Sequence, residues 1–358
     1  MIRRRGLIGL AVATAAMTAA AVAVNLEQPG TATVEPGARL LPGLAERIGD
    51  AAVISVRTAR DAFTIRRDGD SWGMADRDGY PVRASAVRAA LVGLAELRLE
   101  QAKTSAPELY GRIAVDDPDD DDARSLRVTV ADAGGATLAD LIVGNRRPGG
   151  LGALAEAHYA RRPGEARSWL AAGTLDLPRD PIDWLETRLM DIEPGRIARV
   201  VIEGPDRPPL ILVRDRPAED DLRIDGLPEH RVVDRAYRVT NVGTVLQGLD
   251  LTDVRPAAGL AFAAVPPRAT FTTLDGLRVT ATLAPDPDDP AFDWVRFDVA
   301  AVPPAAGLAD GNPSRTVAEA DDMRSRLDGW AYRLPRFKID RLRIRLEDIT
   351  EPATDGPP

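Results

Sequence analysis

Two short stretches far apart in the chain carry the same pattern of leucines. Gly93 to Leu99 reads GLAELRL and Val245 to Leu251 reads VLQGLDL, so Leu94, Leu97 and Leu99 align without a gap with Leu246, Leu249 and Leu251. The order of the expected strands and helices around them repeats as well. The separation of these two stretches in the sequence is longer than the period of a solenoid repeat. The pattern therefore predicts two tandem domains, over residues 51–178 and 195–347.

Each domain is expected to be an antiparallel sheet with one helix packed on a face, which is an α+β fold. In the first domain, Val53 to Val56 and Ala62 to Arg66 read as strands, and Asp68-Gly69 reads as a tight turn. Ser85 can cap a helix whose apolar stripe would cover the sheet. The stripe consists of Val87, Ala90, Leu91, Leu94 and Leu97.

The second domain repeats this order. Ile197 to Ile202 and Leu210 to Arg214 read as strands, and a helix is expected from Asp234 through Leu249. Between the domains, residues 179–194 are expected to form a connecting helix that begins at Asp180-Pro181 and continues through Leu185 and Leu189. Residues 348–358 are expected to be a disordered tail.

The N-terminus carries the clearest signal about location. Arg3 to Arg5 precede Gly6 to Val24, which are 19 residues without a charge and long enough to cross a bilayer as a helix. Arginines before the span keep that end in the cytoplasm. We therefore expect residues 1–24 to be a single-pass anchor in the inner (cytoplasmic) membrane, followed by a linker over 25–50, with the bulk in the periplasm or otherwise outside the cytoplasm. A cleaved signal segment is the other reading, because Ala21-Val22-Ala23 has the small-x-small form of a signal-peptidase site.

Composition excludes several classes of function. A formal net charge of -9 argues against nucleic acid as a partner, because neutralising phosphates needs a basic face. The chain has no cysteine and only 2 histidines, which excludes thiol nucleophiles, disulfides and the usual zinc ligand sets. We expect no catalytic, cofactor-binding or metal site, and no cofactor.

Some motifs nevertheless invite a chemical reading. Residues 150–155 (GLGALA) match the dinucleotide fingerprint in letters, but Arg146-Arg147-Pro148 separate them from the strand, so a loop is expected instead. The acidic run Asp116 to Asp122, and Asp286, Asp288 and Asp289 around their prolines, could offer oxygens to calcium. Neither spacing is that of a known calcium loop, so solvated connectors are expected and weak calcium binding stays open.

The histidines and the tryptophans also admit a chemical and a structural interpretation. No Gly-x-Ser-x-Gly elbow accompanies His158 or His230, so both are expected to be ordinary strand or surface residues. The tryptophans could line a ligand groove, but large aromatic side chains dominate core burial and are expected to pack there. They are Trp72, Trp169, Trp184, Trp294 and Trp330.

Several segments together resemble a bacterial family, the domain of unknown function numbered 4340. They are the N-terminal span, RDGDSW at 67–72, LAELRLE at 94–100, KTSAPELYG at 103–111, HYARRPGEARSWL at 158–170, DPIDWL at 180–185 and WAYRLPRFK at 330–338. The resemblance implies a membrane-anchored extracytoplasmic protein, often encoded beside ABC transporter components of the gliding-motility type. It supplies no catalytic residues.

The expected function is therefore that of a non-enzymatic accessory or scaffold subunit of an ABC-type envelope transport system. Its expected partners are the membrane, transporter components and other envelope proteins. Two other functions stay open: an extracytoplasmic module that binds a small ligand, and a carboxylate-dependent hydrolase. A pocket lined by tryptophan and arginine would indicate binding, and an acid pair in a cleft would indicate hydrolysis.

Overall fold

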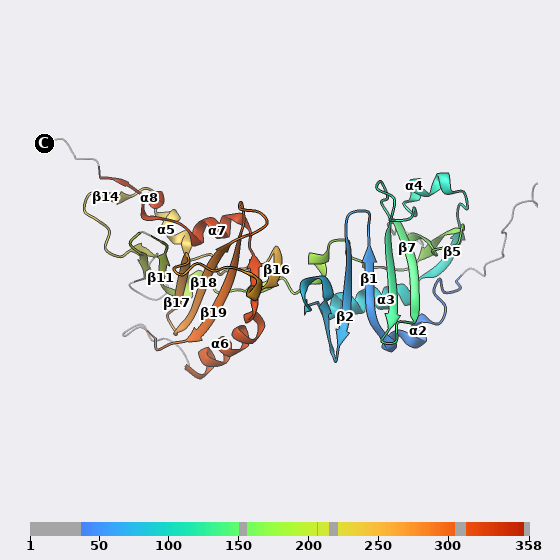
Figure 1. Ribbon diagram of the computed structural model, residues 1–358, viewed down its shortest axis with the longest axis horizontal. Coiled ribbons are helices and arrows are strands. Elements are labelled where there is room, and N and C mark those ends of the chain that lie inside the picture. Colours follow the sequence, from blue (N-terminus) through green and yellow to red (C-terminus); the bar gives the residue numbers. More distant parts are fainter. Residues whose placement is uncertain (1–36, 150–155, 206, 215–220, 305–312, 354–358) are drawn as a thin grey trace, which may run out of the picture. The chain divides into compact units, whose positions relative to one another are not determined.

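The computed structural model describes residues 37–149, 156–205, 207–214, 221–304 and 313–353. Strands, mostly antiparallel, outnumber helices there, which confirms the α+β class (Figure 1). The chain divides into two compact units. Unit 1 comprises the residues up to Thr64 together with Ser85–Arg179, and unit 2 comprises Ile65–Ala84 together with the residues from Asp180 onward.

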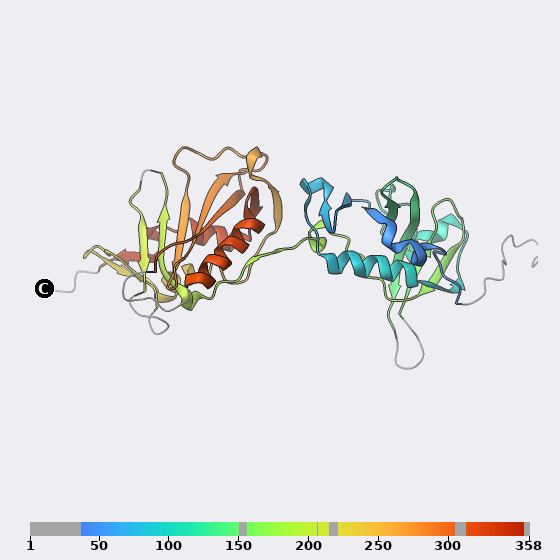
Figure 2. The same cartoon turned by 90° about the horizontal axis from the view of Figure 1, so that it is seen from below.

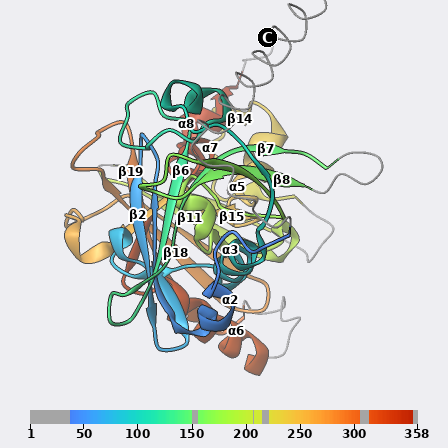
Figure 3. The ribbon, with the colours of Figure 1, turned by 90° about the vertical axis from the view of Figure 1, so that its right-hand side faces the viewer.

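The first sheet has nine strands in the order β4-β3-β2-β1-β6-β7-β8-β9-β5. Its strands are β1 (Ala51–Arg57), β2 (Ala62–Asp68), β3 (Ser71–Met74), β4 (Tyr80–Pro81), β5 (Arg98–Ala102), β6 (Leu126–Asp132), β7 (Thr137–Arg147), β8 (Ala157–Arg161) and β9 (Ser168–Ala172). β7 and β8 lie side by side (Figure 3). In their pairing, Arg146 is opposite His158. The chain passes from unit 1 into unit 2 within β2.

The second sheet, in unit 2, has eight strands in the order β13-β12-β11-β17-β18-β19-β20-β16. These strands are β11 (Ile197–Glu203), β12 (Leu210–Val213), β13 (Arg223–Ile224), β16 (Asp253–Pro256), β17 (Arg268–Thr273), β18 (Leu277–Pro285), β19 (Asp293–Ala301) and β20 (Trp330–Arg333). Two small sheets accompany it. One pairs β10 (Arg188–Met190) with β15 (Leu249–Asp250), and the other pairs β14 (Arg231–Val233) with β21 (Thr350–Pro352).

The strand order of the second sheet matches that of the first from β3 onward. β11 pairs with both β12 and β17, just as β1 lies between β2 and β6. In each sheet, a strand that precedes the four-strand meander in sequence closes the far edge: β5 beside β9 in the first, β16 beside β20 in the second. The two sheets thus share one order of eight strands.

One helix covers a face of each sheet (Figure 2). α3 (Ala84–Glu96) buries a stripe that includes Val87, Ala90, Leu91 and Leu94, as its sequence predicts. α6 (Pro313–Leu327) buries Thr316, Ala320, Met323 and Leu327 at helical spacing, against β18 and β19. The short helices are α2 (Leu44–Arg47), α4 (Tyr110–Ile113), α5 (Ala236–Val242), α7 (Arg336–Leu342) and α8 (Leu346–Ile349), and the 3-10 turns are η1 (Ile48–Asp50), η2 (Ala75–Arg77), η3 (Pro107–Leu109), η4 (Pro181–Trp184), η5 (Pro194–Arg196) and η6 (Ala257–Gly259).

All six aligned leucines lie in hydrophobic cores. Leu94, Leu97, Leu246 and Leu249 are each 0% exposed, and Leu99 and Leu251 are nearly as buried. Their burial explains why the pattern is visible in the sequence, since each position must stay apolar.

Two segments expected to lack structure are folded. The linker expected over 25–50 is wrong for its last part, because Leu40, Leu41 and Leu44 are buried and Leu40 donates its N–H to the carbonyl of Leu97. The disordered tail expected over 348–358 is wrong for residues 348–352, which form the end of α8 and strand β21. In both cases a few apolar or backbone groups find tertiary partners that local composition does not reveal.

Two expected helices are shorter than predicted. Asp180 caps as expected, accepting the N–H of Ile182 at 2.9 Å, but the helix expected over 179–194 is only the single turn η4. Leu185 is already extended because it bridges to Val82, and Leu189 lies in β10. The helix expected from Asp234 to Leu249 ends at Val242 in the structure, and turns then carry Val245 and Leu246 into the core.

The predicted membrane anchor over residues 1–24 lies outside the described residues. In the part of the chain that the structure describes, from residue 37 to residue 353 with its gaps, no helix combines the length and apolarity that crossing a bilayer requires.

Candidate functional site

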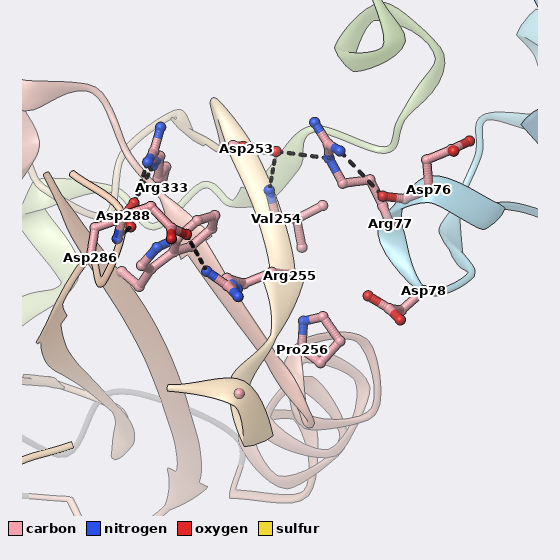
Figure 4. Close-up of a pocket in the computed structure, with 12 residues that line it drawn as sticks. Asp76, Arg77, Asp78, Asp253, Val254, Arg255, Pro256, Asp286, Asp288 and Arg333 are labelled. Carbon is pink, nitrogen blue, oxygen red and sulfur yellow. Dashed lines mark hydrogen bonds and ion pairs between the residues drawn. The ribbon is translucent and has the colours of Figure 1, made fainter. Parts of the chain in front are cut away.

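A cavity of about 510 Å³ opens in unit 2 where β16, β19 and β20 meet the loop after β18 (Figure 4). The turn η2, which belongs to the Ile65–Ala84 segment of unit 2, contributes the remaining wall. The cavity is lined by Asp76, Arg77, Asp78, Asp253, Val254, Arg255, Pro256, Gly259, Asp286, Asp288, Trp294 and Arg333. We call it the Trp294 pocket.

Two arginines stack on the indole of Trp294. The guanidinium carbons of Arg255 and Arg333 lie 5.4 Å and 5.1 Å from the ring centre. Trp294 is only 4% exposed, and the two cation–π contacts with its ring help to hold both guanidinium groups in place. The indole Nε1 is buried and makes no hydrogen bond to any residue that the structure describes.

The loop after β18 supplies the carboxylates that face these arginines. Asp286 is 3% exposed, and its Oδ1 accepts the N–H groups of Asp288 at 2.9 Å and Asp289 at 3.4 Å. Its Oδ2 accepts hydrogen bonds from Arg333. Burial alone would raise the pKa of Asp286, but the bonds from Arg333 and from the backbone outweigh burial and hold that pKa below its usual value.

This arrangement explains why the sequence places three aspartates here. The Asp288 carboxylate faces Arg255 at 3.7 Å, and Asp289 accepts the N–H of Ala291 at 3.0 Å. The described residues contain no group of three or more histidine, aspartate or glutamate side chains placed to hold a metal ion. The three aspartates act as turn residues and arginine partners.

A third ion pair closes the pocket on the side of η2. Arg77 Nε lies 2.9 Å from Asp253 Oδ1, which also accepts the N–H of Val254 at 2.9 Å (Figure 4). The segment that carries Arg77 is packed into unit 2 by Tyr80, whose ring stands edge-on to Trp330 with 5.0 Å between centroids. The pocket therefore presents three guanidinium groups, each facing a carboxylate.

The guanidinium and carboxylate groups of the lining suit recognition of a polar molecule. A general acid needs a raised pKa, whereas the buried carboxyl in the pocket, Asp286, has a lowered one. Burial raises the pKa of Asp293 on β19, but Asp293 is hydrogen-bonded to Arg343 and is not among the lining residues.

The two histidines lie in different units. His158, on β8, is 5% exposed and its Nε2 lies 3.4 Å from Glu156 Oε1, and burial lowers its pKa. It lines a second, smaller cavity in unit 1. His230 is exposed in the loop before β14, and its carbonyl accepts the N–H of Ala353.

The remaining sequence candidates are dispersed. The acidic run joins α4 to β6, and Asp119 to Asp122 in it are exposed, with Asp119 paired to Arg57 at 2.6 Å. The dinucleotide-like stretch 150–155 lies outside the described residues. Trp169, Trp184 and Trp294 are buried, as core packing predicts, whereas Trp72 and Trp330 are half-buried.

Sequence reasoning selected Trp294, Asp286 and Asp288 but missed the arginines of the pocket. Arg77, Arg255 and Arg333 sit in three separate segments, and arginine is the general basic residue of a chain with 46 lysines and arginines. The pairing of β16 with β20, which sets Asp253 opposite Arg333, brings Arg255 and Arg333 together, and Arg77 joins them through its bond to Asp253.

Comparison with known proteins gives one family match. The model of a family described as a domain of unknown function (DUF4340) matches residues 72–263, which is more than half of the chain. No curated protein and no solved structure matches the chain.

Proposed function

Since this chain belongs to the DUF4340 family, we propose that it is a membrane-anchored extracytoplasmic protein that serves as a non-enzymatic accessory subunit of an ABC-type envelope transport system. The family description assigns no activity, so the proposal draws on the topology of the sequence and on the fold. The link to a transport system comes from the resemblance of the sequence motifs, which implies that the gene lies beside genes for ABC transporter components.

The N-terminal sequence supports the location. Arg3 to Arg5 followed by 19 uncharged residues would leave the arginines in the cytoplasm and carry everything after Asn25 across the membrane. A reporter enzyme that is active only outside the cytoplasm, fused after Pro358, should then be active. Activity of a cytoplasm-only reporter at the same position would refute this topology.

The observation that carries the accessory role is the order of eight strands that the two sheets share. We propose that the two sheets arose by duplication, in keeping with the aligned leucines at Leu94 and Leu246. Two related sheets on one chain offer related surfaces to a multisubunit partner, and engaging both raises the overall affinity without any new chemistry.

The test is recovery of transporter components with the full chain. A C-terminally tagged full chain, crosslinked in membranes and purified in detergent, should bring down the permease and ATPase subunits of one ABC system in constant ratio. A matched tagged control carrying only residues 1–50 should recover none. Absence of transporter subunits from the full-chain sample, with the fold intact by circular dichroism, would overturn the accessory role.

Binding of a small polar ligand is a second candidate function, and the Trp294 pocket favours it. Stacking on Trp294 and pairing with Asp286 and Asp288 prepare Arg255 and Arg333 to meet a ligand that carries both acidic and basic groups. Arg333→Gln should weaken binding of such a zwitterion while leaving recovery of transporter components unchanged. Arg278→Gln, on the neighbouring strand β18 and outside the pocket, is the matched control.

A further inference from the structure

A stretch of 12 residues in unit 2, from Pro256 to Pro267, contains no polar or charged side chain. It reads PAAGLAFAAVPP and leads from the end of β16 through the turn η6 to β17. Beyond η6 it has no regular secondary structure. Connections between strands run over the surface, so a connection of this length without a polar side chain is unusual. We call it the apolar segment.

The apolar segment is not packed into the core of unit 2. None of its 12 residues is buried. Val265 is 67% exposed, the highest value among the large apolar side chains that the structure describes as exposed. The other exposed residues are Ala258, Gly259, Ala261, Ala263 and Ala264, and Leu260 and Phe262 are half-buried. A run of exposed apolar residues marks a surface that contacts another protein or a membrane.

The arginines beside the apolar segment are all paired. Arg255 and Arg268 flank it in sequence, and the guanidinium carbon of Arg296 lies 4.7 Å from the ring centre of Phe262. The pairs are Arg255 with Asp288 at 3.7 Å, Arg268 with Glu203 at 2.6 Å and Arg296 with Asp298 at 3.5 Å. These three pairs add no net charge, so apolar surface is what the segment offers to a partner.

The chemistry of the segment favours lipid over protein as that partner. Its side chains can neither donate nor accept a hydrogen bond, whereas a protein interface carries about one hydrogen bond per 100–200 Å². A bilayer requires no hydrogen bond from a side chain. Backbone groups outside helices and closed sheets cannot enter the hydrocarbon core without cost, so the segment would stay at the level of the headgroups.

We propose that the apolar segment inserts shallowly into the surface of the bilayer to which the chain is anchored. This inference rests on the proposed membrane anchoring. An anchor over residues 1–24 would hold the segment beside lipid at a high effective concentration, so weak insertion suffices. Leu260, Phe262 and Val265 supply the largest apolar side chains for insertion.

The absence of cysteine from the chain allows one label to be placed at a chosen position. The full chain is reconstituted in phosphatidylcholine vesicles, and a fluorophore is attached at Val265→Cys. A lipid that carries a nitroxide near its headgroup should quench this label severalfold more than a label at Val317→Cys. Val317 is the matched control, because it is an exposed valine on α6 of the same unit.

Flotation of the vesicles reports anchoring separately from insertion. A chain that floats with its vesicles, with no more quenching at Val265→Cys than at Val317→Cys, would overturn this inference and leave the anchoring intact. A chain that does not float would overturn both. A label at Val265→Cys that lipid alone does not quench, and that only added transporter subunits shield, would assign the segment to a protein partner instead.

Two further comparisons test whether apolar surface drives the insertion. Adding anionic phosphatidylglycerol should leave the quenching at Val265→Cys nearly unchanged, because the neighbouring arginines are paired. Quenching that appears only with anionic lipid would refute the proposal.

A charge introduced beside the label should weaken insertion. Ala263→Asp, combined with Val265→Cys, should lower the quenching severalfold, because a carboxylate is costly to move into an apolar layer. Ala318→Asp, the same change at an exposed alanine of α6, should have no effect. Undiminished quenching in the Ala263→Asp variant, with its fold retained by circular dichroism, would overturn the proposal.

Discussion

Arg196 Nη2 lies 2.8 Å from Asp275 Oδ2, so the residue just before β11 is tied to the turn between β17 and β18. The same guanidinium contacts both oxygens of Glu319 on α6, each at 2.9 Å. One arginine thus fastens the helix of unit 2 and the start of its sheet to one turn. Thr273 and Thr316 complete the hydrogen bonding of Asp275.

This cluster predicts a dependence of stability on pH. Burial alone would raise the pKa of Asp275, but bonds from Thr273 and Arg196 outweigh burial and lower that pKa overall. The ionised carboxylate therefore stabilises the fold above the unfolded-state pKa of about 3.9, and this stabilisation is lost as pH falls through the lower folded-state value. Urea unfolding followed by circular dichroism should show the loss below about pH 4 and a shallower slope in Asp275→Asn. Asp298→Asn is the exposed control, and an equal slope in Asp275→Asn and the natural chain would contradict the prediction.

Lys338 is expected to be a stabilising residue of the core of unit 2. It is 6% exposed, and its Nζ donates to the carbonyls of Thr244, Val245 and Gln247 at 2.9, 2.8 and 2.8 Å. Lys338→Met leaves these carbonyls without a donor and should lower the free energy of unfolding by about 3 kcal/mol.

The other lysine of the chain is the matched control. Lys103 is half-buried and bonds to the Gln101 side chain, so Lys103→Met should cost less than about 1 kcal/mol. Similar losses for the two variants would show that the three carbonyls find other donors.

Gly276 is predicted to tolerate no side chain. Its φ of +87° favours glycine, and a Cβ there would overlap the carbonyl oxygen of Val302. Gly135 has a similar φ of +84° with open space around it. By thermal denaturation, Gly276→Ala should destabilise by about 3 kcal/mol or more, and Gly135→Ala by only about 1 kcal/mol, the cost of the left-handed backbone. Equal losses would mean that the turn at Gly276 relaxes away from Val302.

Leu94→Ala and Leu246→Ala are expected to lower the free energy of unfolding by similar amounts. Both are 0% exposed, and Leu→Ala at such positions leaves a cavity that costs about 2–5 kcal/mol. Calorimetry of the two single variants should show comparable destabilisation, whereas Leu109→Ala, at a residue that is 36% exposed, should have little effect. A large loss for one leucine and none for the other would argue that the two positions are not equivalent.

Local pattern was enough to predict the elements whose residues contact their near neighbours in sequence. The stripe of α3, the strands around Asp68-Gly69 and the cap at Asp180 could all be predicted, because helical spacing, turn chemistry and capping act over a few residues. The pattern of aligned leucines could also be recognised in the sequence, because burial keeps each of those positions apolar.

Tertiary structure alone decided what distant segments do together. The chain between Leu40 and Asp50 is folded because it packs and hydrogen-bonds against Leu97 and its neighbours. Leu189 lies in a strand, where a helix was expected, because that strand pairs with β15. The charged side chains of both cavities come from segments far apart in the chain. No motif of fixed spacing in the sequence therefore predicts either cavity. The sequence determined the elements and the leucine pattern, whereas long-range pairing and burial decided which arginines meet which carboxylates, since Coulomb and desolvation energies depend on distance in space.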